Sequence, residues 1–155
     1  MLNVANTIAL LGKSENDNEV TAFLHDASIP QPLKRPARDE FQVNIQLEDQ
    51  PIELCFVTAE SLGAKGNTLA EGELILNTVF IIPDIESSDD DPVGILPFGL
   101  NIRESRSATR KNLGDPEWSS PVMKNDRWII DGIRVLICFS NDESSVRQIA
   151  FSYDP

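Results

Sequence analysis

The chain is poor in the residues on which metal-dependent and nucleophilic catalysis depend. Its 155 residues include one histidine, His25, and two cysteines, Cys55 and Cys138, with no Cys-x-x-Cys pair and no Gly-x-Ser-x-Gly motif. Zinc sites need clustered cysteine and histidine ligands, and a nucleophile needs an adjacent base, so the sequence predicts neither. We therefore interpret His25 as a structural residue and predict no catalytic residue, metal or cofactor.

Both cysteines lie inside apolar, strand-like runs, Leu-Cys-Phe and Ile-Cys-Phe. A free cysteine in such a run behaves as a small buried hydrophobe. A disulfide between Cys55 and Cys138 would require their two strands to be neighbours in the sheet.

Basic residues are also scarce. Lysine and arginine total 13 and aspartate and glutamate total 25, which gives a formal net charge of −12. Such a chain repels nucleic-acid phosphate and anionic lipid, so neither is a predicted partner. It attracts basic proteins and hard cations, although acidity can also serve only to keep a protein soluble.

Long apolar runs are missing too. No stretch approaches the roughly 20 apolar residues that a membrane-spanning helix needs, and the segment from Met1 to Ile8 lacks the basic start of a secretory signal. We expect a soluble, cytoplasmic protein without a membrane partner. Hydrophobic residues make up 41% of the chain, which is enough for one packed core.

Two helices are predicted near the N-terminus. Val4, Ile8 and Leu11 have helical spacing, and Gly12 can end that helix. A second helix is expected to start between residues 14 and 18, with Ser14, Asn16 or Asn18 as its cap, and to bury an apolar stripe of Val20, Phe23, Leu24 and Ala27 before Pro30 and Pro32 stop it.

Strands dominate the remainder. Alternating apolar residues over 41–57, interrupted by a turn at 48–51, predict a hairpin, and the apolar run 74–82 predicts a central strand. Residues 60–72 are interpreted as a flexible turn region. Asp131-Gly132 between two apolar runs predicts a second hairpin with a type I′ turn. Residues 146–153 form a last strand that places Arg147, Ile149, Phe151 and Tyr153 on one face, and the large apolar Ile149 and Phe151 mark this face as the inward one.

This order of elements predicts an α+β fold, an antiparallel sheet with helices packed on one face. We expect a single domain over residues 1–155. The pairs Leu11-Gly12 and Leu113-Gly114 each follow a helical segment and precede strands. They are compatible with two pseudo-repeat halves, 1–83 and 96–155, joined by an acidic loop at 84–95.

The acidic loop is the first candidate for a functional site. Five carboxylates occur close together, and they are Asp84, Glu86, Asp89, Asp90 and Asp91. Their spacing lacks the alternate ligands, central glycine and distal glutamate of an EF-hand loop, so calcium binding is not favoured. The loop is either a solvated surface loop or a docking segment for a basic protein, because carboxylates pair bidentately with arginine.

A basic helix and two tryptophans follow. A helix capped by Ser105 or Ser107 and ended by Gly114 would place Arg103, Arg106 and Arg110 along one face. These arginines could bind a phosphate, but balancing the acidic loop or solvating the helix is favoured. Trp128 starts a strand and is predicted in the core. Trp118 is either a protein-docking anchor beside acidic residues or a side chain that closes the core edge.

Several short motifs occur along the chain. They are Leu96-Pro97-x-Gly99-Leu100, Ser105-Arg106, Leu113-Gly114-x-Pro116, a tryptophan-led strand, a Val-Leu-Ile-Cys-Phe strand, and Leu11-Gly12-Lys13 with Val20 and Phe23-Leu24. With these motifs the chain resembles small bacterial immunity proteins encoded beside polymorphic toxins, including secretion-system effectors. At the level of fold, the helix, Leu-Gly, sheet arrangement also resembles the repeat of beta-lactamase-inhibitor-like proteins.

The resemblance implies a non-catalytic inhibitor that binds a cognate, basic bacterial toxin, such as a nuclease, and neutralises it. The predicted partner-binding residues are Trp118 and the five acidic-loop residues 84, 86, 89, 90 and 91. Two alternatives stay open. One is an adaptor or chaperone that carries an effector without inhibiting it, and the other is an enzyme whose site would be a deep pocket with carboxylates of raised pKa.

Overall fold

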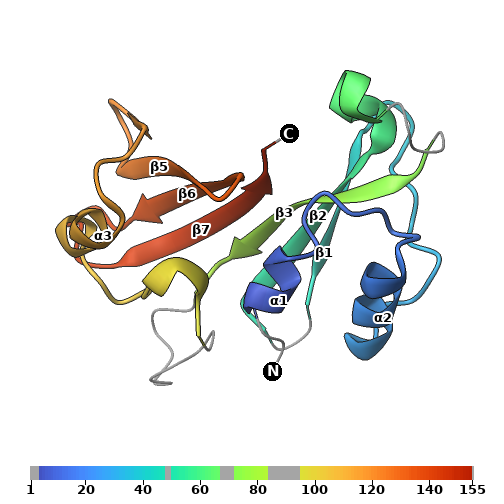
Figure 1. Cartoon of the computed structure of the whole chain (residues 1–155), viewed down its shortest axis with the longest axis horizontal. Coiled ribbons are helices and arrows are strands. Elements are labelled where there is room, and N and C mark those ends of the chain that lie inside the picture. The colour runs from blue at the N-terminus through green and yellow to red at the C-terminus, as the bar shows by residue number, and fades with distance from the viewer. Residues whose placement is uncertain (1–3, 48–49, 67–71, 84–94, 155) are drawn as a thin grey trace.

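Antiparallel strand pairing organises the molecule (Figure 1). The computed structural model describes residues 4–47, 50–66, 72–83 and 95–154. Within these ranges seven strands form one sheet in the order β1-β2-β3-β7-β6-β5-β4. The strands are β1 (Gln42–Gln46), β2 (Ile52–Thr58), β3 (Leu74–Ile81), β4 (Trp118–Ser119), β5 (Asn125–Ile130), β6 (Ile133–Phe139) and β7 (Val146–Tyr153).

Helical segments connect the strands. They are the α-helices α1 (Val4–Ile8), α2 (Asn18–Asp26) and α3 (Arg106–Leu113), and the 3₁₀ segments η1 (Ala59–Gly66) and η2 (Pro97–Gly99). The mixed composition confirms the predicted α+β class. None of the helices in the described ranges is long and apolar enough to cross a membrane.

Local sequence signals explain both hairpins. Asp131 and Gly132 have φ values of 52° and 79°, the positive values of a type I′ turn, and join β5 to β6 as predicted. β1 pairs antiparallel with β2, so the hairpin predicted over 41–57 is confirmed, while residues 48–49 of its turn lie outside the described ranges. The predicted central strand is β3, which pairs with β2 and β7.

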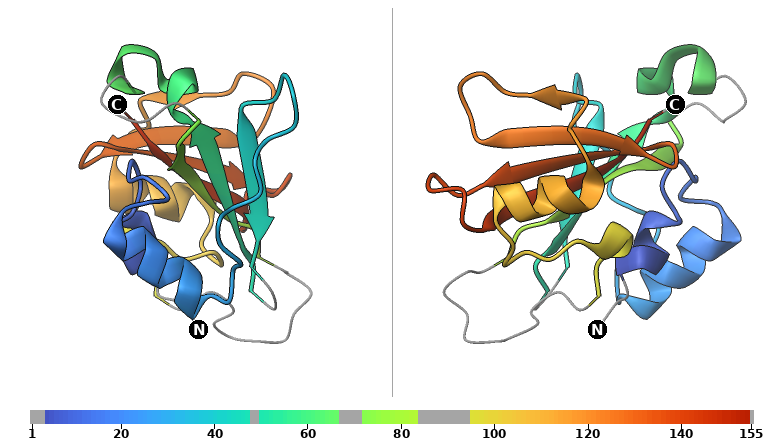
Figure 2. Two further views of the ribbon diagram at one scale, coloured as in Figure 1. Left: turned by 90° about the vertical axis from the view of Figure 1, so that its right-hand side faces the viewer. Right: turned by 60° about the vertical axis from the view of Figure 1, so that its left-hand side comes forward.

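The two faces of the sheet differ. On what we call the core face, Leu54, Val79 and Phe151 are fully buried and join Val4 of α1 and Leu24 of α2 in one hydrophobic cluster. Because side chains alternate along a strand, the intervening residues point to the opposite side, here called the second face. There a smaller cluster of Cys55, Val57 and Ile75 packs against Leu62 of η1 and Phe80. Figure 2 shows η1, drawn in green, well apart from the blue helices α1 and α2.

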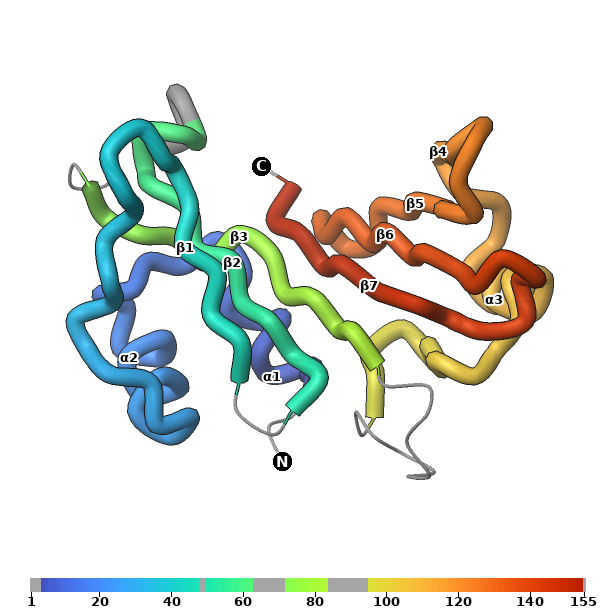
Figure 3. The backbone as a smooth tube through the Cα atoms, turned by 180° about the vertical axis from the view of Figure 1, so that it is seen from behind, coloured from blue at the N-terminus to red at the C-terminus, as the bar shows by residue number. Residues whose placement is uncertain are grey.

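The central pair β3 and β7 joins the two halves of the chain (Figure 3). Val79 lies opposite Phe151, and Ile81 lies opposite Ile149. Strands β1 to β3 come from residues before the acidic loop, and strands β4 to β7 come from residues after it. The main hydrophobic cluster contains residues from both halves, so one continuous core spans the central pair.

Buried Glu15 ties the α1–α2 connection to β3. Its carboxylate accepts hydrogen bonds from the Arg35 guanidinium, at 2.8 Å from Nη1, and from the backbone N–H of Leu74 at 2.7 Å. The Glu15 N–H donates to the Leu74 carbonyl at 2.8 Å. These bonds satisfy a carboxylate that is only 8% exposed.

Two predictions about the N-terminal helices need correction. The cap of α2 is Asp17, whose carboxylate accepts the Glu19 N–H, and not Ser14, Asn16 or Asn18. Ser14 instead forms a bridge with Ile75 of β3, so tertiary pairing removes it from the helix start. Helix α1 ends at Ile8, and the Gly12 N–H donates to the Leu76 carbonyl rather than capping the helix.

Gly12 has a separate reason to be glycine. Its φ is +83°, and a Cβ there would lie 2.8 Å from a carbon of the Tyr153 ring. A side chain would therefore meet both an unfavourable backbone conformation and a steric clash. Gly114, by contrast, is the C-cap of α3, and its N–H donates to the Arg110 carbonyl. The two Leu-Gly pairs thus share a positive φ but perform different structural tasks.

The region predicted as a flexible turn contains the 3₁₀ segment η1, so that prediction was wrong for residues 60–66. The predicted short helix is confirmed as α3, because Ser105 caps it by accepting the Ala108 N–H at 3.1 Å and Gly114 ends it. The Leu-Pro-Phe-Gly-Leu motif forms η2, in which Phe98 and Gly99 have φ values of 62° and 69°.

Candidate functional site

The predicted partner-binding residues separate into two groups. Asp84, Glu86, Asp89, Asp90 and Asp91 lie outside the described residues. Trp118 is described, and it begins the short edge strand β4. It remains 41% exposed, so it does not close the core edge. The buried tryptophan is Trp128, as predicted, and its Nε1 donates to the Gly114 carbonyl at 3.1 Å.

An arginine fixes the Trp118 ring. Trp118 lies opposite Arg127 across the β4–β5 pair, and the Arg127 Cζ is 5.1 Å from the ring centroid. Arg127 Nε also donates to Glu117 Oε1 at 2.5 Å. The cation–π contact and the ion pair hold the ring on the second face, because Arg127 alternates with the buried Asp126. A pre-positioned aromatic side chain loses little conformational entropy when a partner covers it.

Exposed apolar side chains accompany Trp118 on the β4–β5 side of the sheet. Val122 is 84% exposed, Met123 is 57% exposed, and Ile129, which has the same facing as Arg127, is 48% exposed. We call Trp118, Val122, Met123 and Ile129 the open-face patch. Exposed apolar side chains gathered on one surface are typical of interaction sites.

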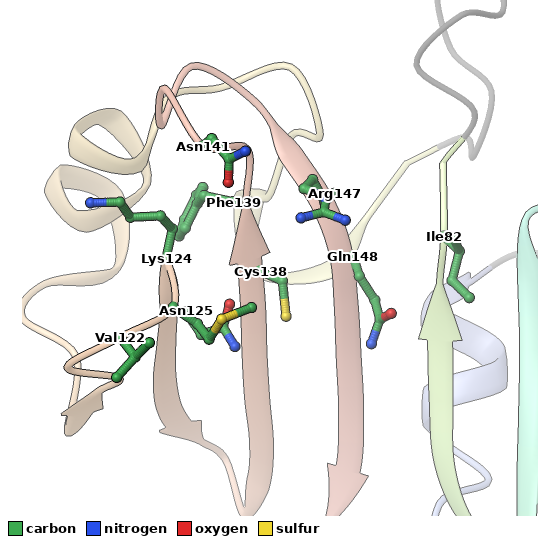
Figure 4. Close-up of a pocket in the computed structure, with 10 residues that line it drawn as sticks. Ile82, Val122, Lys124, Asn125, Cys138, Phe139, Asn141, Arg147 and Gln148 are labelled. Atoms are coloured by element: carbon green, nitrogen blue, oxygen red, sulfur yellow. The ribbon is translucent and has the colours of Figure 1, made fainter.

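A cavity of about 340 Å³ adjoins this patch (Figure 4). Met123 and Val122 line one side of it, and Ile82, at the end of β3, lines the other. Figure 4 shows the Cys138 thiol between the β5 side chain of Asn125 and the β7 side chains, while the amino end of Lys124 points away from that thiol.

Five polar side chains line the cavity. They are Lys124, Asn125, Asn141, Arg147 and Gln148. No side-chain hydrogen bond or ion pair joins these five to any other residue in the described ranges. The amides of Asn125, Asn141 and Gln148 and the guanidinium of Arg147 can all donate hydrogen bonds. The cavity is therefore able to accept a polar or acidic side chain from a partner.

A β-bulge sets the position of Arg147. The β6–β7 register shifts between Cys138, which lies opposite Gln148, and Phe139, which lies opposite Val146. Arg147 is the extra residue, and its side chain is exposed although its sequence parity matches the buried Ile149. Bulges redirect side chains in this way near functional sites. The sequence alternation alone placed Arg147 with Ile149 and Phe151.

The arginines of α3 converge on a buried carboxylate rather than on solvent. Asp126 is fully buried and accepts two hydrogen bonds from Arg106, at 2.7 and 3.0 Å, and two from Arg110, at 2.7 and 2.8 Å. The Ser119 hydroxyl adds one at 2.7 Å. Arg106 also donates to Glu143 at 2.8 Å. This cluster locks α3 against β5.

The cluster changes the proton affinity of Asp126. Burial acts to raise the pKa of its carboxyl, but hydrogen bonds from Arg110, Arg106 and Ser119 outweigh burial and hold that pKa below its usual range. Hydrogen bonding to Asp126 raises the pKa of both guanidinium groups. The carboxylate stays ionised with its oxygens occupied, so it is not available as a general base or a metal ligand.

The sequence prediction for these arginines was wrong. Arg106 and Arg110 neither solvate the helix nor form a phosphate site, since they bind Asp126. Sequence reasoning missed Asp126 altogether, although one signal was present. Asp126 alternates in phase with Trp128 and Ile130, so the pattern places a carboxylate on the apolar face of its strand. Such a residue requires a buried cationic or hydrogen-bonding partner.

The cysteines are free and separated. Cys55 lies on β2 and Cys138 on β6, with β3 and β7 between them. Strands about 4.8 Å apart put these two residues roughly 14 Å apart across the sheet, beyond the Cα separation of about 7 Å that a disulfide spans. Burial raises the pKa of both thiols, and Arg147 partly opposes that rise at Cys138. Both therefore favour the protonated, weakly nucleophilic form.

His25 is exposed on α2 beside Asp26, at 3.7 Å, and does not belong to a buried cluster. Across the described ranges, no group of three or more histidine, cysteine or carboxylate side chains is arranged to hold a metal ion.

Comparisons with protein-family models, with curated proteins and with solved structures found no match to the chain.

Proposed function

We propose that this chain is a non-catalytic immunity protein that binds and neutralises a cognate, basic bacterial toxin. The observation that carries the proposal is the exposed Trp118, held under Arg127 within the open-face patch. Tryptophan and arginine are the residues most often found at binding hot spots. The geometry therefore supports Trp118 as the anchor of a protein interface.

The charge distribution supports separate roles in binding for the acidic part of the chain and for the open-face patch. Residues 1–83 contain twelve acidic and five basic side chains, residues 84–94 contain five acidic and none basic, and residues 95–155 contain eight of each. The open-face patch thus belongs to the part of the chain without net charge. The acidic part would attract a basic partner over long range, and the patch would supply short-range affinity.

We further propose that α1, α2 and α3 cover the core face and leave the β5–β7 part of the second face to the partner. Buried residues of α1 and α2 belong to the core-face cluster, and α3 is tied to the core-face residue Asp126. Of the segments that pack on the second face, η1 reaches β2 and β3 through Leu62. The acidic-loop residues stay a prediction for a second contact with the partner.

The buried carboxylate of Asp126 and the two cysteine thiols support binding rather than catalysis. Asp126 is saturated by five hydrogen bonds, and both thiols are favoured in the protonated form. The alternative function is an adaptor or chaperone that carries an effector. It would use the same surface, but it would leave the active site of the effector free.

The test is co-purification with the product of the adjacent gene, followed by an assay of that product's activity with and without this protein. We expect a one-to-one complex in which the activity is lost. In that complex Trp118→Ala should weaken binding by roughly thirtyfold, as expected for a hot-spot residue. The control is Phe41→Ala, which removes another exposed aromatic ring at the opposite edge of the sheet.

Each outcome has a distinct meaning. A complex in which the toxin stays active would replace the immunity proposal with the adaptor. Equal effects of Trp118→Ala and Phe41→Ala would remove Trp118 from the interface. Failure to form any complex would rule out the immunity and adaptor functions for this pair of proteins. The enzyme alternative would then be tested at the cavity lined by Arg147.

A further inference from the structure

Strand β1 is an edge strand of the described sheet. Among the strands that the structure describes, it pairs with β2 alone. The Phe41 carbonyl accepts the Thr58 N–H, and the Leu47 N–H donates to the Ile52 carbonyl, both at 2.9 Å. Because backbone groups alternate in direction along an antiparallel strand, the N–H and C=O groups of residues 42, 44 and 46 point away from β2. No other described residue bonds to these outward groups.

The edge lacks the usual protection against pairing. Natural edge strands carry charged residues, prolines or bulges, or are very short. The opposite edge of this sheet follows that rule, since β4 has two residues. By contrast, β1 has five residues, Gln-Val-Asn-Ile-Gln, with no charge, no proline and an unbroken register against β2.

The sequence around β1 is a palindrome by residue type. Residues 39–49 read Asp-Glu-Phe-Gln-Val-Asn-Ile-Gln-Leu-Glu-Asp, with Asn44 at the centre. Reading outward from Asn44 in both directions gives an aliphatic residue, glutamine, a large apolar residue, glutamate and aspartate. An antiparallel pair of identical strands centred on Asn44 would therefore match like with like at every position.

We propose that β1 pairs with β1 of a second copy of this chain, about a two-fold axis that passes beside Asn44. Asn44 then lies opposite Asn44 of the other copy, and Gln42 lies opposite Gln46. These are the residues whose backbone groups point outward, so each such pair can exchange two hydrogen bonds. The two sheets become one continuous sheet through a self-complementary interface.

The pairing also accounts for apolar side chains left uncovered at this edge. Phe41 is 63% exposed, and Val43 and Ile45 are only partly buried where they pack on the core. By alternation all three share the core face. In the dimer Val43 lies opposite Ile45 of the other copy, and Phe41 lies opposite Leu47. Aromatic and β-branched cross-strand pairs are stabilising, so the core continues across the two-fold axis.

The acidity of the chain gives the dimer a distinctive salt dependence. Each copy has a formal net charge of −12, and Asp39 and Glu40 immediately precede the paired segment, so dimerisation brings two acidic molecules together. Added salt screens this repulsion and strengthens the dimer. A complex with a basic toxin responds in the opposite direction, so the two associations are separable by ionic strength.

Sedimentation equilibrium of the full chain tests the proposal. We expect a monomer–dimer equilibrium whose dissociation constant decreases between 0.05 and 0.5 M NaCl, roughly a change from a 14 Å to a 4 Å screening length. Asn44→Lys and Asn44→Asp each place like charges opposite one another at the two-fold axis. Each variant alone should dimerise at least roughly fivefold more weakly. An equimolar mixture of the two should regain dimerisation, because lysine then faces aspartate.

The matched control is Ala22→Lys on the exposed side of α2, which adds the same charge away from β1. It should leave the dissociation constant unchanged. Circular dichroism checks that all variants fold, as expected because the Asn44 side chain is exposed. A chain that stays monomeric up to about 1 mM, the range of weak association, overturns the proposal. So does a dimer that Asn44→Lys does not weaken, or a mixture that fails to restore pairing.

Discussion

Asp126 is fully buried on the core face of β5 and binds Arg106 and Arg110 of α3. Removing one partner of a buried ion pair leaves an uncompensated charge, which costs about 3–5 kcal/mol. We therefore expect Asp126→Asn to lower the free energy of unfolding by that amount in urea titrations. The control is Glu143→Gln, because Glu143 binds the same Arg106 but is 42% exposed. It should cost about 1 kcal/mol or less.

The pH dependence provides a second measurement of Asp126. Because its pKa is lower in the folded chain than in the unfolded chain, the unfolded state binds more protons as the pH falls. The stabilisation that the ionised Asp126 contributes is present in full above the pKa of about 4 that its carboxyl has in the unfolded chain. It is lost as the pH drops toward the lower pKa of the folded chain. Asp126→Asn should therefore show a shallower loss of stability between pH 4 and 2. If the unfolding free energies of the variant and of the unchanged chain fall in parallel over this pH range, Asp126 does not have a lowered pKa in the folded chain.

At the scale of elements, both ends of α3 were predictable from neighbouring residues in the sequence. The sequence predicted its end at Gly114 and its cap at Ser105 or Ser107, and in the structure the Ser105 hydroxyl accepts the Ala108 N–H. Ser105→Ala should cost about 1 kcal/mol of stability, measured by thermal unfolding. Ser107→Ala makes the same chemical change inside the helix without removing the cap. If the two variants unfold at the same temperature, the cap does not stabilise α3.

Other elements show where local signals fail. Residues Ser14, Asn16, Asp17 and Asn18 all have side chains that can cap a helix, so the sequence offered several starts for α2. The choice of Asp17 depends on the pairing of Ser14 with Ile75, which is distant in sequence. Segment η1 was predicted as part of a turn region because residues 60–72 contain three glycines. Its helical form accompanies the packing of Leu62 on β2 and β3.

At the scale of the whole molecule, the shared core should make the two halves unfold together. Leu54 of β2 is fully buried, and both tryptophans lie in the other half of the chain. Leu54→Ala should cost about 2–5 kcal/mol and shift the urea midpoint reported by tryptophan fluorescence as much as that reported by far-ultraviolet circular dichroism. Ile95→Ala, at an 85% exposed position, is the control. A fluorescence midpoint unmoved by Leu54→Ala would show two independent units.

The candidate site was only partly predictable from the sequence. Trp118 was identified because an exposed tryptophan beside acidic residues can anchor a protein partner. Its contact with Arg127 depends on the pairing of β4 with β5. The cavity beside it combines residues from strands β5, β6 and β7 with Ile82, which follows β3, and Arg147 reaches it through a bulge that reverses the facing expected from alternation. Neither feature leaves a local pattern in the chain.

The sequence by itself determined the features that depend on neighbouring residues. Period-two alternation defined the strands, Asp131-Gly132 defined a turn, and Gly114 with a cap at Ser105 or Ser107 defined α3, because backbone conformation and capping act over a few residues. Tertiary structure alone decided the partners. It joined β3 to β7, kept Cys55 and Cys138 apart, and brought Asp126 to Arg106 and Arg110. A buried charge binds whichever opposite charge the fold brings near, and that choice depends on distance in space rather than in sequence.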